Sequence, residues 1–382
     1  MEVPPHLLQD LFQAYFDARR NKRNTNNQLQ FELNYEKNIF ALFSQLKDKS
    51  YSISKSICFI VFYPVKREIF AGDFRDRVIH HLVFNALNPL FEKLFIYDSY
   101  SCRKEKGPLF GIKRVQYFHR SCSRNYQKES FFLKLDIQGY FMSIDQKILF
   151  QKIQRAIQRK QIPYAEFWLW LLELIIFHDP TKNCVMKGHK KDWDGLPPSK
   201  SLFGTSCGTG LPIGNLTSQL FGNVYLNDFD HFIKSQMKCR YYGRYVDDFV
   251  ILDNDKEFLK FLIPKIKTFL HENTRLILHP KKIHLQPCKN GIPFLGAIIK
   301  PYRTYVRNRT KGAFFKKIQY WENQMPLSSK EKQSCTSCLQ SYLGLMKHFN
   351  TSRLQEKMIQ RNMSPELRKI FHKNKPPIYD HI

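Results

Sequence analysis

The sequence predicts an α+β fold, in which helices and short strands follow one another without regular alternation. Apolar residues recur at helical spacing near both ends of the chain, whereas β-branched and aromatic residues gather in short runs in its middle. A doubly wound sheet would alternate strand and helix regularly, so the irregular order favours α+β. With 382 residues, 43% of them hydrophobic, the chain is long enough to bury a large core.

The first half of the chain predicts helices and strands in turn. Its helical segments repeat apolar positions three or four residues apart, and its strand segments are rich in Val, Ile, Phe and Tyr. In chain order the expected elements are a helix over 6–20, a polar link over 21–28, a helix over 35–49, strand over 51–66, a helix over 75–95 that closes at Pro89 or shortly after, a strand over 130–141 that runs into a turn, and a mostly helical region to about 178.

The second half begins with a stretch over 179–210 that is rich in Gly, Pro, Ser and Lys and predicts a loop. Beyond it the periodicity changes several times between helix and strand. The expected elements are a helix over 215–236, a hairpin over 243–252, a helix over 257–273, strand over 275–285 and 292–306, and a mainly helical tail from 301 to 382.

The net charge of +28 points to a polyanionic partner, for which nucleic acid is the expected class, although a lysine-rich solvated surface is the plain alternative. The tail from residue 301 holds 16 Lys or Arg against 5 Asp or Glu. No basic amphipathic helix suggests a membrane surface. The apolar run "FWLWLLELIIF" (167–177) is too short to span a bilayer and predicts a buried helix.

The cysteines and the first residues of the chain suggest a reducing cytosol. Nine cysteines are scattered without a framework of spacings, and "MEVPPHLLQD" has no signal-peptide pattern. Cys335 and Cys338 form one close pair, but a zinc site needs four ligands and no second pair lies at a matching distance. We therefore expect free thiols and a cytoplasmic protein.

The stretch "GRYVDDFVIL" (243–252) predicts a tight hairpin with Asp247 and Asp248 side by side. Such tips usually carry Asn-Gly or Asp-Gly, and here two like charges repel. A divalent cation would neutralise them, and two-metal phosphoryl chemistry takes its carboxylates from more than one segment. Asp136 follows an apolar strand where the chain turns, and is the candidate partner. Taken alone, Asp136 is explained as a strand-end cap, the pair as a solvated turn, and Asp145 as a helix cap.

Taken together and in sequence order, these segments resemble the palm motifs of reverse transcriptases. The matching stretches are "LDIQGYFMSID" (135–145), "GLPIGNLTSQLFGNVYLN" (210–227), "YVDD" (245–248) and "IPFLGAIIKP" (292–301). Upstream, "PVKREIFAGDFRDRVIHHLVFNALNPLFEKLFIYDSYSCRKEKG" (64–107) resembles the fingers motifs of bacterial and group II intron enzymes. The resemblance covers roughly residues 51–305.

The resemblance implies a right-hand polymerase with an antiparallel palm sheet, helical fingers and a helical thumb. The expected parts are an N-terminal helical extension over 1–50, fingers and palm over 51–305, and a basic thumb over 306–382 that follows the duplex backbone. The implied activity is RNA-templated DNA synthesis. The implied partners are template RNA, an RNA–DNA hybrid and deoxynucleoside triphosphates.

Carried over residue by residue, the resemblance implies that Asp136 and Asp247 bridge two Mg²⁺ ions, with Mn²⁺ as an alternative. Asp248 supports the site, and the carbonyl of Ile137 is a further ligand. One ion lowers the pKa of the primer 3′-hydroxyl, and the other holds the triphosphate and the leaving pyrophosphate. Lys282 matches a lysine proposed to protonate pyrophosphate, with a solvated lysine as the alternative.

The resemblance also implies a nucleotide pocket and a primer grip. Fingers cations clamp the triphosphate, and an aromatic side chain excludes a 2′-hydroxyl, although a core aromatic is the plain alternative. Arg75 and Arg77 either bind template phosphates or cap a helix. The implied positions are Lys66, Arg67 and Arg103 for the clamp, Phe141 for the aromatic gate, Ile213, Gly214 and Gln219 for the rest of the pocket, and Phe294, Leu295 and Gly296 for the grip.

One segment departs from the commonest pattern, because residues 213–219 read Ile-Gly-x-x-x-Ser-Gln where most bacterial relatives read Gln-Gly-x-x-x-Ser-Pro. This form resembles the reverse transcriptases of diversity-generating retroelements. Those enzymes misincorporate frequently opposite template adenine, and their product rewrites a variable region of a target gene. They work with a small basic accessory variability protein, here expected in an RNA-dependent complex. Isoleucine cannot make the hydrogen bond that glutamine offers near the nascent pair, a loss of about 1 kcal/mol, unless Ile213 is simply an apolar wall.

Other reverse transcriptases and a non-catalytic scaffold are the alternatives. Retron enzymes carry Asn-Ala-x-x-His and a thumb Val-Thr-Gly, but "NALN" (85–88) lacks the histidine and the thumb reads "SYLGLM" (341–346). Group II intron enzymes usually continue into longer maturase and endonuclease regions, and a phage-defence reverse transcriptase is a further alternative. An RNA-binding scaffold that lost its chemistry is disfavoured, because the three carboxylates, the fingers cations and the gate aromatic are all present.

Overall fold

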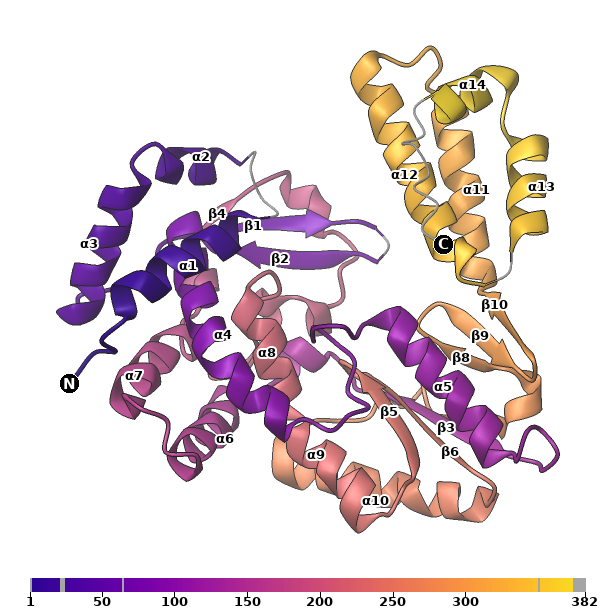
Figure 1. The fold of residues 1–382 in the computed structure, drawn as a ribbon, viewed down its shortest axis with the longest axis horizontal. Coiled ribbons are helices and arrows are strands. Elements are labelled where there is room, and N and C mark those ends of the chain that lie inside the picture. The colour runs from indigo at the N-terminus through magenta and orange to yellow at the C-terminus, as the bar shows by residue number, and fades with distance from the viewer. Residues whose placement is uncertain (1, 21–24, 64, 350, 374–382) are drawn as a thin grey trace. The chain divides into compact units, whose positions relative to one another are not determined.

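The computed structural model describes residues 2–20, 25–63, 65–349 and 351–373, and its chain divides into two compact units (Figure 1). The first unit comprises residues 1–111, 133–251 and 256–285, and the second comprises 112–132, 252–255 and 286–382. Both contain helices and strands, so the expected α+β class is confirmed. The three-part division at residues 50 and 305 stays a prediction.

Helices open the first unit, as the apolar spacing predicts. The first of them buries one stripe of side chains against α4, and α4 contacts α8 on another side (Figure 1). Part of the predicted polar link, residues 21–24, lies outside the described residues, and its end forms a further short helix. The bounds are α1 (Leu7–Arg19), α2 (Asn26–Glu32), α3 (Tyr35–Lys47), α4 (Phe74–Leu94) and α8 (Leu216–Tyr225).

The helix α4 spans nearly the expected range of 75–95, but it ends at Leu94, five residues after Pro89, rather than at the proline itself. A proline inside a helix removes one hydrogen bond and crowds the preceding turn. Leu90 and Phe91, which follow it, are both buried. Their packing outweighs the local cost, so the proline marks a position inside the helix rather than its end.

A small sheet in the first unit has the order β2-β1-β4. The strands β1 (Ser56–Val61) and β2 (Arg67–Ala71) pair antiparallel, with Cys58 opposite Phe70. The segment 179–210, expected as loop, contributes β4 (Cys184–Met186), which pairs parallel with β1. Three residues are too few to show a strand period, so this strand was not predictable from the pattern.

A second sheet has four strands in the order β5-β6-β3-β7. Only two residues join its neighbouring strands β5 and β6, so these run antiparallel, as the hairpin prediction requires. Phe229 packs against Phe249 of β6 and Phe269, with ring centroids 5.1 and 5.9 Å away. The bounds are β3 (Phe131–Asp136), β5 (Tyr241–Tyr245), β6 (Asp248–Asp253) and β7 (His284–Pro287).

The strand expected over 275–285 is wrong for most of its length. Only His284 and Leu285 belong to β7, and the rest of the segment is irregular apart from an isolated bridge between Ile137 and Leu278. Ile277 is 61% exposed, so the apolar letters that suggested a strand are not all buried. Pro280 also lacks the N–H that a ladder needs.

The remaining helices of the first unit follow the predictions with one exception. The run expected as one helix over 215–236 is divided into α8, α9 and a π-helical turn at Phe232–Gln236. The expected buried helix is α7, and among the described residues no helix is both long and apolar enough to traverse a bilayer. The bounds are α6 (Gln146–Arg159), α7 (Ala165–Ile176), α9 (Asn227–His231) and α10 (Lys256–Thr274).

The second unit combines a three-stranded antiparallel sheet with helices. The run 292–306 forms its three strands, and the helical tail is confirmed as far as residue 373, beyond which it lies outside the described residues. Most of α5 also belongs to this unit. The bounds are α5 (Pro108–Cys122), β8 (Ile292–Phe294), β9 (Ala297–Lys300), β10 (Arg303–Val306), α11 (Asn308–Glu322), α12 (Ser329–Lys347), α13 (Ser352–Asn362) and α14 (Pro365–Lys373).

Candidate active site

The hairpin of β5 and β6 turns through Val246 and Asp247, and Asp248 is the first residue of β6. Val246 has a φ of +56°, which is the left-handed region. A β-branched residue is a genuine outlier there, and such strain costs on the order of 1–3 kcal/mol. The surroundings must therefore hold this turn, and the turn sets the direction of the Asp247 side chain.

Three carboxylates meet at this turn. Asp136 ends β3, which is the neighbour of β6 in the sheet. Burial, together with the negative charges of Asp136 and Asp248, raises the pKa of Asp247 to about 6. Burial also raises the pKa of Asp248, although the Lys134 ammonium works in the opposite direction. The structure thus brings together the three aspartates that the sequence singled out.

Two lysines partly neutralise the carboxylates. Lys282 Nζ lies 2.8 Å from Asp136 Oδ1, and Lys134 Nζ lies 2.7 Å from Asp248 Oδ1. The sequence motifs indicate Lys282 but not Lys134. The signal was present, because Lys134 stands two residues before Asp136 in one strand, and alternate residues of a strand share a face.

The donor atoms here suit a hard cation. Ile137 and Leu278 form a non-hydrogen-bonded antiparallel pair, because the flanking bonds run from Gln138 N to Ile277 O and from His279 N to Asp136 O. The Ile137 carbonyl therefore points away from the Leu278 segment. No group of three or more His, Cys, Asp or Glu with metal-binding geometry occurs in the part of the chain that the structure describes.

The available set is therefore two aspartates and one backbone carbonyl. Mg²⁺ is commonly held by one or two carboxylates and takes its other ligands from water and substrate phosphates. The mutual repulsion that raises the pKa of Asp247 is also what such a cation would relieve. The residues present fit a divalent ion of this kind.

Phe141 and Ile213 lie against one apolar cluster, formed by Cys58, Phe70, Met142 and Leu202. Backbone hydrogen bonds fix both segments: Phe70 N donates to Ile213 O at 2.8 Å, and Leu211 N donates to Phe141 O at 2.8 Å. Ile213 is therefore half-buried beside the gate candidate rather than surrounded by water.

Gly214 is required by its surroundings. Its φ is +136°, and a Cβ atom there would lie 2.7 Å from the carbonyl oxygen of Phe70. A side chain would push the segment away from β2. Gln219, five residues on, is exposed on α8.

Two of the predicted triphosphate cations lie at the beginning of β2. Arg67 is exposed, and its charge opposes the burial that raises the pKa of Tyr245, which places it within electrostatic reach of the hairpin. Lys66 Nζ donates to the carbonyl of Asp194 at 2.6 Å. Arg67 is thus the better placed of the two for a charged ligand at the hairpin.

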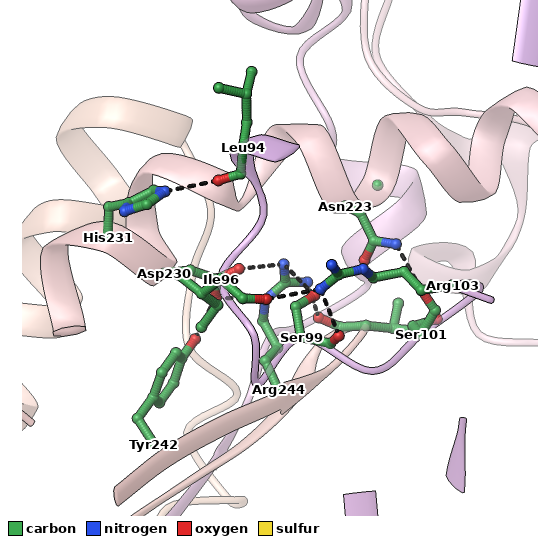
Figure 2. A network of polar contacts seen from close by, with 12 residues as sticks. Leu94, Ile96, Ser99, Ser101, Arg103, Asn223, Asp230, His231, Tyr242 and Arg244 are labelled. Carbon is green, nitrogen blue, oxygen red and sulfur yellow. Dashed lines mark hydrogen bonds and ion pairs between the residues drawn. The ribbon is translucent and has the colours of Figure 1, made fainter. Parts of the chain in front are cut away.

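Arg103, the third predicted cation, is engaged in the scaffold instead. Its guanidinium is paired with Glu92 at 2.8 Å and donates to the carbonyls of Ile96 and Ser99 at 2.7 and 2.9 Å (Figure 2). The side chain is only 6% exposed. The guanidinium N–H groups that make these bonds are not available to a triphosphate, so the role of Arg103 in this structure is to hold the scaffold.

The predicted primer grip belongs to the second unit. Phe294 ends β8 and is fully buried. Leu295 and Gly296 form a two-residue turn to β9 with φ values of +46° and +86°, the backbone of a primed hairpin turn.

A buried ion pair next to the hairpin was missed. Arg244 and Asp230 are both 0% exposed, with Arg244 Nη2 2.6 Å from Asp230 Oδ2. The available signal was an arginine within an otherwise apolar and aromatic strand, since a buried charge requires a partner. The sequence did not indicate which residue that partner would be.

Comparisons with known proteins identify the family of the chain. A profile described as reverse transcriptase (RNA-dependent DNA polymerase) matches residues 67–299. The chain is 22% identical over 254 residues to Protein YkfC of Escherichia coli K12, and 26% identical over 162 residues to the retron Ec83 reverse transcriptase of Escherichia coli. These alignments cover 58% and 41% of this chain, and only 60% and 44% of the two relatives.

Among solved structures, the chain resembles telomerases of two yeasts. The apo telomerase of Candida tropicalis aligns with a TM-score of 0.47 at 12% identity, over 67% of this chain and 55% of the other. The telomerase of Candida albicans in complex with a fragment of telomeric RNA aligns with a TM-score of 0.45 at 11% identity, over 94% of this chain and 59% of the other.

The profile match includes β2, the carboxylate that ends β3, the hairpin of β5 and β6, and most of β9, which are the elements in which the sequence motifs lie. The α+β class with an antiparallel palm sheet, expected of a right-hand polymerase, is confirmed. Because the match covers more than half of its residues, the chain belongs to the reverse transcriptase (RNA-dependent DNA polymerase) family.

Proposed function

We propose that the protein is an RNA-directed DNA polymerase, which copies an RNA template into complementary DNA from deoxynucleoside triphosphates. The observation that carries this proposal is the electrostatic coupling of Asp136 and Asp247 in one half-buried site, at the end of β3 and in the turn of the hairpin. Both residues fall inside the region that matches the family profile. This arrangement suits in-line phosphoryl transfer, which needs carboxylates from separate segments.

Each side chain has a role in this proposal. Asp136, Asp247 and the Ile137 carbonyl would hold two Mg²⁺ ions, or Mn²⁺ as an alternative, and the bound ions would supply activation of the primer hydroxyl and binding of the triphosphate. Lys282 reaches Asp136 at 2.8 Å, so its ammonium can donate a proton to the pyrophosphate leaving beside that carboxylate. Phe141 forms the wall that excludes a 2′-hydroxyl, and Arg67 supplies fixed positive charge.

The proposal predicts that Asp247→Asn abolishes primer extension while RNA binding stays within a few-fold. The amide removes a ligand charge without changing the shape of the turn. Asp10→Asn, at an exposed position of α1, is the matched control and should extend normally. Extension is measured on a primed RNA template with Mg²⁺, and binding by fluorescence anisotropy. Near-normal extension by Asp247→Asn contradicts the assignment of the site.

We further infer that the enzyme serves a diversity-generating retroelement, with error-prone synthesis at template adenines for mutagenic retrohoming. The Ile-Gly-x-x-x-Ser-Gln segment over 213–219 supports this reading. The proposal includes an RNA-dependent complex with a small accessory variability protein, in the cytoplasm of a bacterial or phage-infected cell. The second candidate is a retron enzyme, favoured by the identity with the retron Ec83 reverse transcriptase.

Ile213→Gln distinguishes the two candidates. If Ile213 withholds a polar contact beside the nascent pair, glutamine should lower misincorporation at template adenines several-fold. Ile213→Val keeps an apolar side chain on the same cluster and should keep the wild-type error rate. Sequencing of complementary DNA made on one adenine-containing template gives the result, with a melting curve to control for the buried amide. A wild-type enzyme that copies adenine as faithfully as the other bases ends the retroelement proposal and leaves the polymerase proposal intact.

A further inference from the structure

The buried pair of Arg244 and Asp230 connects β5, the first strand of the hairpin that carries Asp247, to the helix α9. Arg244 is in β5 and Asp230 is in α9, and neither side chain has any exposed area. Arg244 Nε donates to Asp230 Oδ1 at 2.7 Å and Nη2 donates to Oδ2 at 2.6 Å, so the pair is bidentate (Figure 2). Tyr242 adds a third bond, from its hydroxyl to Asp230 Oδ1 at 2.6 Å. Asp230 is thereby fixed as an anchor for the guanidinium.

The remaining nitrogen of the guanidinium reaches the turn. Arg244 Nη1 donates to the carbonyl oxygen of Val246 at 2.9 Å. Val246 is the residue with the left-handed backbone, and its carbonyl belongs to the peptide that leads into Asp247. The bond therefore acts on the one peptide whose orientation decides where the Asp247 side chain points.

The backbone around Arg244 is also fixed. Arg244 N donates to Asp98 O at 2.9 Å, and Tyr100 N donates to Arg244 O at 2.9 Å. Gly243 permits this approach, because a Cβ atom there would lie only 2.2 Å from the hydroxyl oxygen of Tyr100. The segment beside β5 is itself held by Arg103, through the carbonyls of Ile96 and Ser99 (Figure 2).

We propose that Arg244 is a positioning residue of the polymerase site: anchored on Asp230, it holds the Val246 carbonyl and so fixes the strained turn that presents Asp247. Its effect on catalysis rests on the proposed polymerase function. The alternative is a buried pair that only contributes to the core. Buried pairs often add little to stability compared with apolar residues of similar size, so the bond to the turn is what distinguishes the two readings.

The first variant removes both charges together. Arg244→Met combined with Asp230→Leu leaves no unpaired buried charge, so the protein should fold, with hybrid binding within a few-fold of wild type. We expect kcat to fall about 10- to 100-fold, since a displacement of about 1 Å at a reacting centre has effects of that size. Arg244→Lys retains the charge but lacks the forked donors, and should also lower kcat. Wild-type kcat in both variants overturns the proposal.

A rescue experiment separates positioning from packing. In the double variant, Val246→Gly should restore part of the lost kcat, because glycine adopts a left-handed backbone without strain. Val246→Ala also truncates the side chain but keeps a Cβ atom, and with it the strain of the left-handed backbone. It is therefore the matched control and should restore no activity. Equal behaviour of the two substitutions overturns the proposal, because strain at residue 246 would then be irrelevant.

Hydrogen–deuterium exchange tests the same idea without catalysis. In the double variant the amides of residues 245–248 should exchange several-fold faster than in wild type, while those of α7 remain unchanged. Unchanged exchange in the turn, or a uniform increase over the whole chain, contradicts a local positioning role. If the wild-type protein failed to extend any primer, the polymerase function would fall, but the exchange result would still decide whether Arg244 holds the turn.

Discussion

At the scale of single residues, Asp247 shows how burial and charge act on one carboxyl group. Its pKa is raised to about 6, first by burial and then by Asp136, from an ordinary value of 3.8. Between these two values the folded protein binds a proton that the unfolded chain has already lost. The free energy of unfolding therefore falls as the pH rises through this window. Without a cation, the ionised Asp247 destabilises the fold at neutral pH.

Asp247→Asn should therefore become more stable relative to wild type as the pH rises from about 4 to 7. The amide resembles the neutral acid and does not titrate, so the difference between the two melting temperatures isolates this one group from the other carboxylates. The measurement is a pair of melting curves in EDTA at each pH. Added Mg²⁺ should reduce the difference at pH 7. A difference that stays constant with pH would show that Asp247 is not held in this setting.

The site could be predicted from sequence only where a motif fixes both residue type and order. The three aspartates lie at or next to strand ends in the expected order, and the structure brings them together. Lys134 could have been found from strand alternation. The pairings of Arg103 with Glu92 and of Arg244 with Asp230 could not, because each depends on which carboxylate the tertiary fold places opposite the guanidinium.

At the scale of elements, long periodic helices were predictable and short or composite elements were not. The helices α1, α3, α6, α7 and α10 follow clear apolar stripes. The strand β4 has three residues, and its existence depends on pairing with β1 rather than on its own composition. Pro89 shows the converse case, in which packing of neighbouring side chains overrides a local stop signal.

The segment 179–210 is anchored by one buried side chain, Glu68 of β2. Its carboxylate accepts hydrogen bonds from Trp193 Nε1 at 2.7 Å, Ser201 Oγ at 2.8 Å and Leu202 N at 2.6 Å. The segment 179–210, expected as loop, is thus held to the small sheet at two places. One is the pairing of β4 with β1, and the other is the set of hydrogen bonds that residues 193–202 donate to Glu68.

Glu68→Ala should release this segment. It leaves three donors without an acceptor, and each buried unsatisfied donor costs about 1–3 kcal/mol. Trypsin should then cut within the lysine-rich stretch 182–200 several-fold faster. Glu36→Ala, at an exposed position of α3, is the control and should not change the rate. Equal cleavage in the two variants would mean that Glu68 does not hold the segment in solution.

At the scale of the whole molecule, the net charge of +28 should govern affinity for nucleic acid. One basic surface is a cavity of about 420 Å³ in the second unit, whose lining includes Arg303, Lys311 and Arg353. If such surfaces contact phosphates, the logarithm of the binding constant should fall linearly with the logarithm of the salt concentration, by about 0.7 to 0.9 for each phosphate neutralised.

Arg353→Gln should weaken binding to an RNA–DNA hybrid and reduce this slope by roughly one contact. Anisotropy titrations between about 50 and 200 mM salt cover the range in which the effect is large. Glu356→Gln, three residues later in the same helix and also exposed, serves as the control of opposite charge and should not reduce the slope. A nearly salt-independent affinity would mean that the positive charge serves another partner.

The close approach of Tyr100 to Gly243 restricts which amino acids these two positions can carry during sequence divergence. A side chain at residue 243 would collide with the Tyr100 hydroxyl, so a substitution there is tolerated only after Tyr100 has become smaller. The reverse order passes through a protein whose strand next to the active site is displaced. The two positions should therefore covary in any collection of relatives that diverged from this sequence, and in a library randomised at both, glycine at 243 should be recovered wherever tyrosine remains at 100.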